Sequence, residues 1–200
     1  MPEPIEFYFD FSSPYAYFVY TKVDELAAEA GRTVAWRPYM MGAAFPQTGQ
    51  KPLTEQPLRG AYAKHDWERL ARFMDLPWVL PDKFPYVALA PSRAFYWLEA
   101  RDPATATALA KRVFHGYFGE GRDMAAPEAV AEEGKALGVD PEALIAATRD
   151  PAVKDRLKQV TTEALERGIF GSPTIVVDGE MFWGSDRLWM VKRWLKTGGW

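Results

Sequence analysis

The stretch IEFYFDFSSP, residues 5–14, decides the fold of this 200-residue chain. Apolar residues occupy every second position in it, namely Ile5, Phe7, Phe9 and Phe11. This period of two predicts a β-strand. The Ser-Ser-Pro that follows predicts the start of a helix over residues 15–30, which Gly31 ends. The apolar run TVAWRPY, residues 33–39, predicts a second strand, so the chain opens with a β-α-β unit and a parallel strand pair.

The middle of the chain has the pattern of a helical block. Three Asp-Pro pairs place an N-cap acid before a proline at the first helical position: Asp102-Pro103, Asp140-Pro141 and Asp150-Pro151. Alanine-rich segments follow each pair, and Gly138 and Gly168 stand where helices should stop. We therefore expect five or six helices between about residues 58 and 167.

The end of the chain returns to strands. The run PTIVV, residues 173–177, predicts a buried strand, and Asp178-Gly179 is a hairpin signal that leads into a return strand over residues 180–183. A final helix is expected from Ser185. Apolar residues recur on one of its faces: Leu188, Val191, Trp194 and Leu195.

The order of these elements is β-α-β, helical insertion, β-β-α. This is an α/β fold with thioredoxin topology, in which an all-helical segment is inserted between strands two and three. We expect a thioredoxin-like domain from residues 1–45 plus 168–200, and an inserted helical domain from residues 46–167.

Composition removes several classes of function. The formal net charge is −3 with no block of Lys or Arg, which argues against nucleic acid and against an anionic membrane as partner. No apolar run approaches the ~20 residues that span a bilayer. The first residues carry no signal-peptide pattern, so a cytoplasmic location is expected. The chain has no cysteine and two histidines, so we predict no disulfide, no cysteine nucleophile and no metal site.

The first candidate for chemistry is Ser12-Ser13-Pro14 at the start of the first helix. Unpaired backbone N–H groups at a helix N-terminus favour an anion, and thioredoxin-like oxidoreductases place a reactive cysteine at this point. A serine cannot perform thiol redox chemistry, but its hydroxyl can donate a hydrogen bond to a thiolate that a ligand brings. The alternative is that the serine only caps the helix.

Two further candidates lie near the C-terminus. In FGSPT, residues 170–174, a cis Ser172–Pro173 bond would leave the backbone of Ser172 free to pair with a peptide-like ligand; the alternative is an ordinary trans proline that opens a strand. In FWGSDR, residues 182–187, Ser185 or Asp186 would hold the charged end of a ligand, and the alternative is again a helix cap.

The motifs FDFSSPYAY, FGSPT and FWGSDR resemble those of the kappa-class glutathione transferases and the 2-hydroxychromene-2-carboxylate isomerases, within the DsbA-like thioredoxin group. The three motifs stand in the right order and the resemblance covers nearly the whole chain. It includes two patterns of the helical insertion: Y-x3-D-x2-R, formed by Tyr62, Asp66 and Arg69, and GEGRD at residues 119–123.

The resemblance implies glutathione as cofactor, with Ser13 as the catalytic serine that contacts the glutathione sulfur. It implies that the backbone of Ser172, before a cis Pro173, pairs with the central part of the tripeptide. The γ-glutamyl end would lie on Trp183, Gly184, Ser185 and Asp186. Arg59 falls near the position where the family has a lysine that reaches a glutathione carboxylate.

One position departs from the isomerases. They carry a substrate-contacting lysine shortly after strand two, where this chain has Phe45 and Pro46. Lys51 is the nearest lysine that could replace it. The resemblance to glutathione binding is therefore closer than the resemblance to any one substrate specificity.

The expected function is that of a glutathione-dependent isomerase acting on a small aromatic or electrophilic substrate, as a homodimer. Reversible addition of the glutathione thiolate would allow a bond to rotate. The alternatives are a kappa-like transferase that conjugates electrophiles, and a non-catalytic thioredoxin-like binding protein. A hydrolase with Ser13 as nucleophile is less favoured, because neither His65 nor His115 has a signal that places it beside Ser13.

Overall fold

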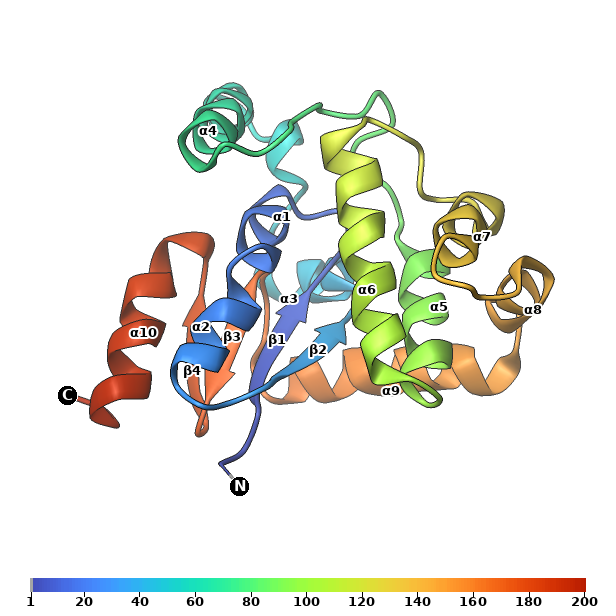
Figure 1. Cartoon of the computed structure of the whole chain (residues 1–200). Coiled ribbons are helices and arrows are strands. Elements are labelled where there is room, and N and C mark those ends of the chain that lie inside the picture. Colours follow the sequence, from blue (N-terminus) through green and yellow to red (C-terminus); the bar gives the residue numbers. More distant parts are fainter. Residues whose placement is uncertain (1) are drawn as a thin grey trace.

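The computed structural model describes residues 2–200. Its centre is a four-stranded sheet in the order β2-β1-β3-β4 (Figure 1). The strands are β1 (Ile5–Phe9), β2 (Val34–Pro38), β3 (Thr174–Val177) and β4 (Glu180–Trp183). The pair β1–β2 is parallel, whereas β3 runs antiparallel to both β1 and β4. The predicted thioredoxin topology is confirmed.

Residues 2–200 form ten α-helices around and beside the sheet. They are α1 (Pro14–Tyr20), α2 (Val23–Glu29), α3 (Phe45–Thr48), α4 (Arg59–Met74), α5 (Leu89–Glu99), α6 (Pro103–Phe114), α7 (Pro127–Lys135), α8 (Pro141–Ala147), α9 (Pro151–Glu166) and α10 (Leu188–Thr197). Short 3-10 turns cover Met41–Ala44, Leu53–Glu55 and Ser185–Arg187, and a π-helical turn covers His115–Gly119. No helix among residues 2–200 has the length and apolar character needed to cross a bilayer.

The first helix differs from the prediction, because it is divided into α1 and α2. At the break, the Thr21 hydroxyl donates to the carbonyl of Phe18 and the Lys22 amide donates to the carbonyl of Val19. The Lys22 amide thus bonds three residues back instead of the four of a regular α-helix, and the Thr21 side chain bonds a carbonyl of the last turn of α1. As a result α1 has only seven residues.

The alternation in β1 divides the core between the two faces of the sheet. Ile5, Phe7 and Phe9 are fully buried in the large core that also contains Val191 of α10 and residues of α1, α5 and α6. The intervening Tyr8 packs in a second cluster with Ala164 of α9. Helix α9 therefore covers the face opposite α1 and α10, which is the layering that Figure 1 shows.

The six helices α4–α9 lie between β2 and β3 in the chain, as predicted. Each of the three Asp-Pro pairs begins a helix, and each aspartate side chain accepts a hydrogen bond from a first-turn amide. Helix α4 stands apart from α5–α8 and packs against α1 (Figure 1). We retain the division into residues 1–45 plus 168–200 and residues 46–167 as a proposal.

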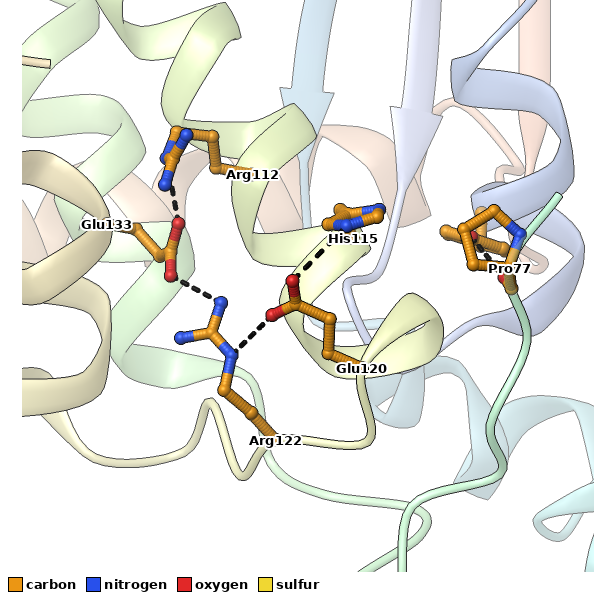
Figure 2. A network of polar contacts seen from close by, with 7 residues as sticks. Pro77, Arg112, His115, Glu120, Arg122 and Glu133 are labelled. Atoms are coloured by element: carbon orange, nitrogen blue, oxygen red, sulfur yellow. Dashed lines mark hydrogen bonds and ion pairs between the residues drawn. The ribbon is translucent and has the colours of Figure 1, made fainter. Parts of the chain in front are cut away.

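The GEGRD pattern belongs to a network of ion pairs within the insertion (Figure 2). Glu133 of α7, which is 4% exposed, lies between Arg112 of α6 and Arg122. Arg122 also pairs with Glu120, whose other oxygen lies 3.4 Å from His115. The network joins α6, α7 and the loop between them, so it stabilises the insertion.

Candidate active site

A cleft of about 840 Å³ opens between the thioredoxin-like part and the insertion. It is lined by the loop after β1, the loop after β2, parts of α4, the segment before α5 and the two C-terminal motifs. Every residue that the sequence singled out for glutathione lines it: Ser13, Arg59, Ser172, Pro173, Trp183, Gly184, Ser185 and Asp186. Residues from the two ends of the chain, such as Ser13 and Asp186, thus meet in one place.

Ser13 is 4% exposed and is the N-cap of α1. Its hydroxyl accepts a hydrogen bond from the Ala16 amide at 3.3 Å and donates one to the Ser172 carbonyl at 2.8 Å. The capping interpretation is therefore confirmed, but it does not account for the donated bond. That bond connects the first motif to the second across 159 residues of chain.

The Ser172–Pro173 bond is cis, as predicted. The Ser172 hydroxyl accepts a hydrogen bond from the Asp10 amide at 2.8 Å, and the preceding Gly171 carbonyl accepts bonds from the Tyr39 and Thr174 hydroxyls. Within residues 2–200, the Ser172 amide makes no hydrogen bond, and neither does the Tyr15 amide at the start of α1. Two backbone donors thus remain available beside Ser13.

Asp10 organises this end of the cleft. Its carboxylate is 4% exposed and accepts hydrogen bonds from the Ser12 amide, the Ser12 hydroxyl and the Met41 amide at 2.8–3.0 Å. No cation pairs with it within the described chain, so burial raises the pKa of the Asp10 carboxyl above its usual range. Asp10 fixes the turn that carries Ser13 and connects it to the loop after β2.

The third motif forms the opposite rim. The Gly184 amide donates to the Pro173 carbonyl at 3.0 Å, and Gly184 has a φ of +108°, which strongly favours glycine. Trp183, which is 49% exposed, covers Gly171 so closely that a β-carbon there would lie 2.1 Å from the indole nitrogen. Neither the 3-10 turn at Ser185–Arg187 nor α10 has a side-chain cap. The capping alternative for Ser185 and Asp186 is therefore wrong.

The insertion supplies an apolar wall. Trp67 and Leu70 of α4 and the segment Phe84, Pro85, Tyr86 and Val87 line it. Tyr15 of α1 also lines the cleft and donates a hydrogen bond to Asp66 of α4 at 3.2 Å. Burial, with the Asp66 charge adding to it, raises the pKa of Tyr15 to about 12, so this phenol stays protonated at neutral pH.

The whole length of this architecture matches one protein family. The model of the DSBA-like thioredoxin domain matches residues 4–196. The chain belongs to this family. Its relatives include the 2-hydroxychromene-2-carboxylate isomerase of Sphingobium xenophagum, at 30% identity over 98% of this chain and 99% of that protein. Glutathione S-transferase kappa 1 of Caenorhabditis elegans is 26% identical over 94% of this chain and 88% of its own length.

Solved structures of the DSBA-like thioredoxin family agree with the fold. A 2-hydroxychromene-2-carboxylate isomerase superposes with a TM-score of 0.87 at 28% identity, covering 96% of this chain and 94% of the other. A probable DsbA oxidoreductase of Streptomyces coelicolor superposes with a TM-score of 0.78 at 18% identity, over 96% and 88% of the two chains. These relatives are named as isomerases and transferases, which supports the prediction that this chain is an enzyme.

The sequence alone left open whether Lys51 and Arg59 belong to the site. Lys51 lines the cleft together with Phe45, whereas Pro46 does not. Arg59 and Arg187 add two further cations. Neither histidine of the chain lines the cleft, so the hydrolase interpretation has no base beside Ser13.

Sequence reasoning missed Asp10, Tyr15, Tyr86 and Arg187 as residues of the cleft. Asp10 and Arg187 lie inside the quoted motifs FDFSSPYAY and FWGSDR, so a closer examination of the polar positions in those motifs would have found them. Tyr86 has no such signal. It reaches the cleft only through the path of the chain after α4.

Proposed function

We propose that this protein is a glutathione-dependent isomerase of the 2-hydroxychromene-2-carboxylate isomerase type, acting on intermediates of aromatic degradation. The observation that carries the proposal is the convergence of Ser13, Ser172–Pro173 and Trp183–Asp186 on one cleft with an apolar wall. The isomerases among the relatives, which match almost the full chain, give the reaction type.

The groups around the cleft fit the chemistry of glutathione. The tripeptide carries one thiol, peptide amides, two carboxylates and one ammonium group. The free Ser172 amide suits a peptide carbonyl, the Asp186 carboxylate suits the ammonium, and the cations Lys51 and Arg59 suit carboxylates. We expect a tripeptide that extends from Arg59 past Ser172 to Asp186 to place its thiol beside Ser13.

Ser13 has to favour the ionised thiol. An ordinary thiol has a pKa of ~8.5, and lowering it by ~2 units requires ~2.7 kcal/mol of differential stabilisation. Because α1 has only seven residues, we assign its dipole the low contribution of ~0.3–1 kcal/mol. A hydrogen bond to an ion contributes ~1.5–3 kcal/mol. The Ser13 hydroxyl, turned from the Ser172 carbonyl to the sulfur, therefore supplies most of the effect.

When bound, glutathione supplies a thiolate that adds reversibly to an electron-poor carbon of the substrate and leaves after a bond has rotated. The protein contributes the surroundings. Trp67, Phe84 and Pro85 form an apolar surface for an aromatic ring, which excludes water from the reacting carbon. Lys51 at the mouth of the same cleft suits a substrate carboxylate, in place of the lysine that the isomerases carry nearer to strand two.

A second candidate uses the same site as a transferase. Relatives named glutathione S-transferase kappa favour it, at 22–26% identity. In that reaction the carbon–sulfur bond persists and glutathione is consumed. The two functions share the binding residues and differ in the fate of the thiol.

The activity assay follows 2-hydroxychromene-2-carboxylate by its absorbance in the presence of purified protein. We expect isomerisation with glutathione and none with S-methylglutathione, which keeps the peptide but blocks the thiol. Calorimetry establishes in parallel that both peptides bind. If the rate with S-methylglutathione, or the rate without any peptide, equals the rate with glutathione, the thiol has no role in the reaction.

A further inference from the structure

The hydroxyl of Tyr86 belongs to the cleft, and the proposed function gives it no role. Tyr86 lines the cleft between the cis Phe84–Pro85 bond and α5, and it is 9% exposed. Its hydroxyl oxygen is buried and has no hydrogen-bond partner among residues 2–200. A buried hydroxyl without a partner destabilises the folded chain, so stability does not explain its presence here.

The ring of Tyr86 is held in place. It packs against the fully buried ring of Tyr117, with the two centroids 4.3 Å apart. The Tyr117 hydroxyl, in contrast, has an ordinary partner, because it donates to the Lys83 carbonyl at 2.8 Å. Of these two neighbouring tyrosines, only the one beside the cleft has a hydroxyl without an acceptor.

The Tyr86 hydroxyl acts as a donor throughout the neutral range. Burial raises its pKa well above the usual value, and the negative charge of Asp10 adds to this effect. A neutral phenol in an apolar wall needs an oxygen acceptor, and an apolar ligand would leave it unsatisfied.

We propose that Tyr86 is a specificity-determining residue that donates a hydrogen bond to an oxygen of the aromatic substrate, and that it selects oxygenated substrates over purely apolar ones. The proposal rests on the proposed function and names its substrate class: an aromatic ring with a carboxylate, phenolic or carbonyl oxygen next to the carbon that reacts. A site that rejects a ligand because its own polar group would remain unpaired discriminates strongly.

Two ligands and two variants test the proposal by equilibrium calorimetry. The ligands are 2H-chromene-2-carboxylate and 1,2-dihydronaphthalene, which has the same ring outline without oxygen. The variants are Tyr86→Phe and the matched control Tyr117→Phe, which removes the hydroxyl that already has a protein partner. We expect Tyr86→Phe to weaken binding of the carboxylate about 10- to 150-fold, which is the range for a lost hydrogen bond to a charged group. Binding of dihydronaphthalene should be unchanged or tighter.

Tyr117→Phe should leave the preference between the two ligands as in the wild type. The proposal is overturned if Tyr86→Phe changes the affinity for both ligands equally, if it changes neither, or if the wild type does not bind the carboxylate. Because the readout is binding rather than turnover, it is separate from the test of the proposed function. A protein without thiol-dependent activity that still shows the Tyr86→Phe effect would retain this inference and lose the reaction.

Discussion

Ser13 carries one hydroxyl that serves two purposes at once. It accepts a hydrogen bond from the Ala16 amide as a helix cap, and it donates one to the Ser172 carbonyl. If a bound thiolate accepts a hydrogen bond from Ser13, the Ser13 O–H group has to turn from the Ser172 carbonyl to the sulfur. The hydrogen bond from the Ala16 amide uses a lone pair of the Ser13 oxygen, whereas the bond to the sulfur uses its proton. The helix cap and the proposed chemistry are therefore compatible.

Replacing Ser13 with alanine separates the two purposes. We expect Ser13→Ala to raise the pKa of the bound glutathione thiol by about 1–2 units, because a hydrogen bond to the ion is lost. Turnover at neutral pH should fall about 3- to 25-fold, in step with the lost thiolate fraction, and recover partly as the pH rises, since the thiol then ionises without help. The measurement is thiolate absorbance in the ultraviolet against pH, with glutathione bound.

Ser12→Ala is the matched control, because it removes the neighbouring hydroxyl, which donates to Asp10. It should shift the thiol titration much less than Ser13→Ala does. A merely structural role for Ser13 predicts instead a loss of ~1 kcal/mol in the free energy of unfolding and near-normal turnover. Superimposable titration curves for Ser13→Ala and the wild type would assign the residue to capping alone.

Asp186 is available for a ligand because it caps no helix and pairs only with the exposed Arg187. We expect Asp186→Ala to weaken glutathione binding about 10- to 150-fold through loss of a charge-assisted hydrogen bond, with the melting temperature nearly unchanged. Calorimetry measures the affinity. Glu29→Ala, which removes a carboxylate from an exposed ion pair with Lys192 outside the cleft, should bind glutathione like the wild type. Equal affinities of all three proteins would remove Asp186 from the site.

At the scale of elements, local signals in the sequence predicted most of the structure. Alternation in residues 5–9 gave β1, the Asp-Pro pairs gave the starts of α6, α8 and α9, and Asp178-Gly179 gave a turn with both φ angles positive. Each of these signals is complete within a few residues. These elements can therefore be predicted from a short segment of sequence alone.

Other elements depend on contacts that no short window contains. The break between α1 and α2 has no proline or glycine to mark it, and the short helix α3 with its flanking 3-10 turns lies in a segment whose sequence gave no clear pattern. Tyr86 is recognisable as a site residue only once the cleft is assembled. The sequence motifs placed the three glutathione segments, whereas the wall that faces them came from the tertiary structure.

At the scale of the whole molecule, the cleft exists because the helical insertion stands over the thioredoxin-like sheet. The sheet side contributes Ser13, Ser172 and Asp186, and α4 and the segment before α5 contribute the apolar wall. Neither part encloses a substrate by itself. The arrangement supports a reaction in which the thioredoxin-like part holds the thiol and the insertion holds the ring.

If the thiol returns unchanged after each reaction, a small amount of glutathione supports many turnovers. Purified protein is supplied with 2-hydroxychromene-2-carboxylate in 100-fold excess over glutathione, and the isomerised product, the free thiol and any conjugate are counted at the end. We expect many product molecules per glutathione, with the free thiol recovered in full. One conjugate for each glutathione consumed, with no isomerised product, would contradict this expectation and identify a transferase.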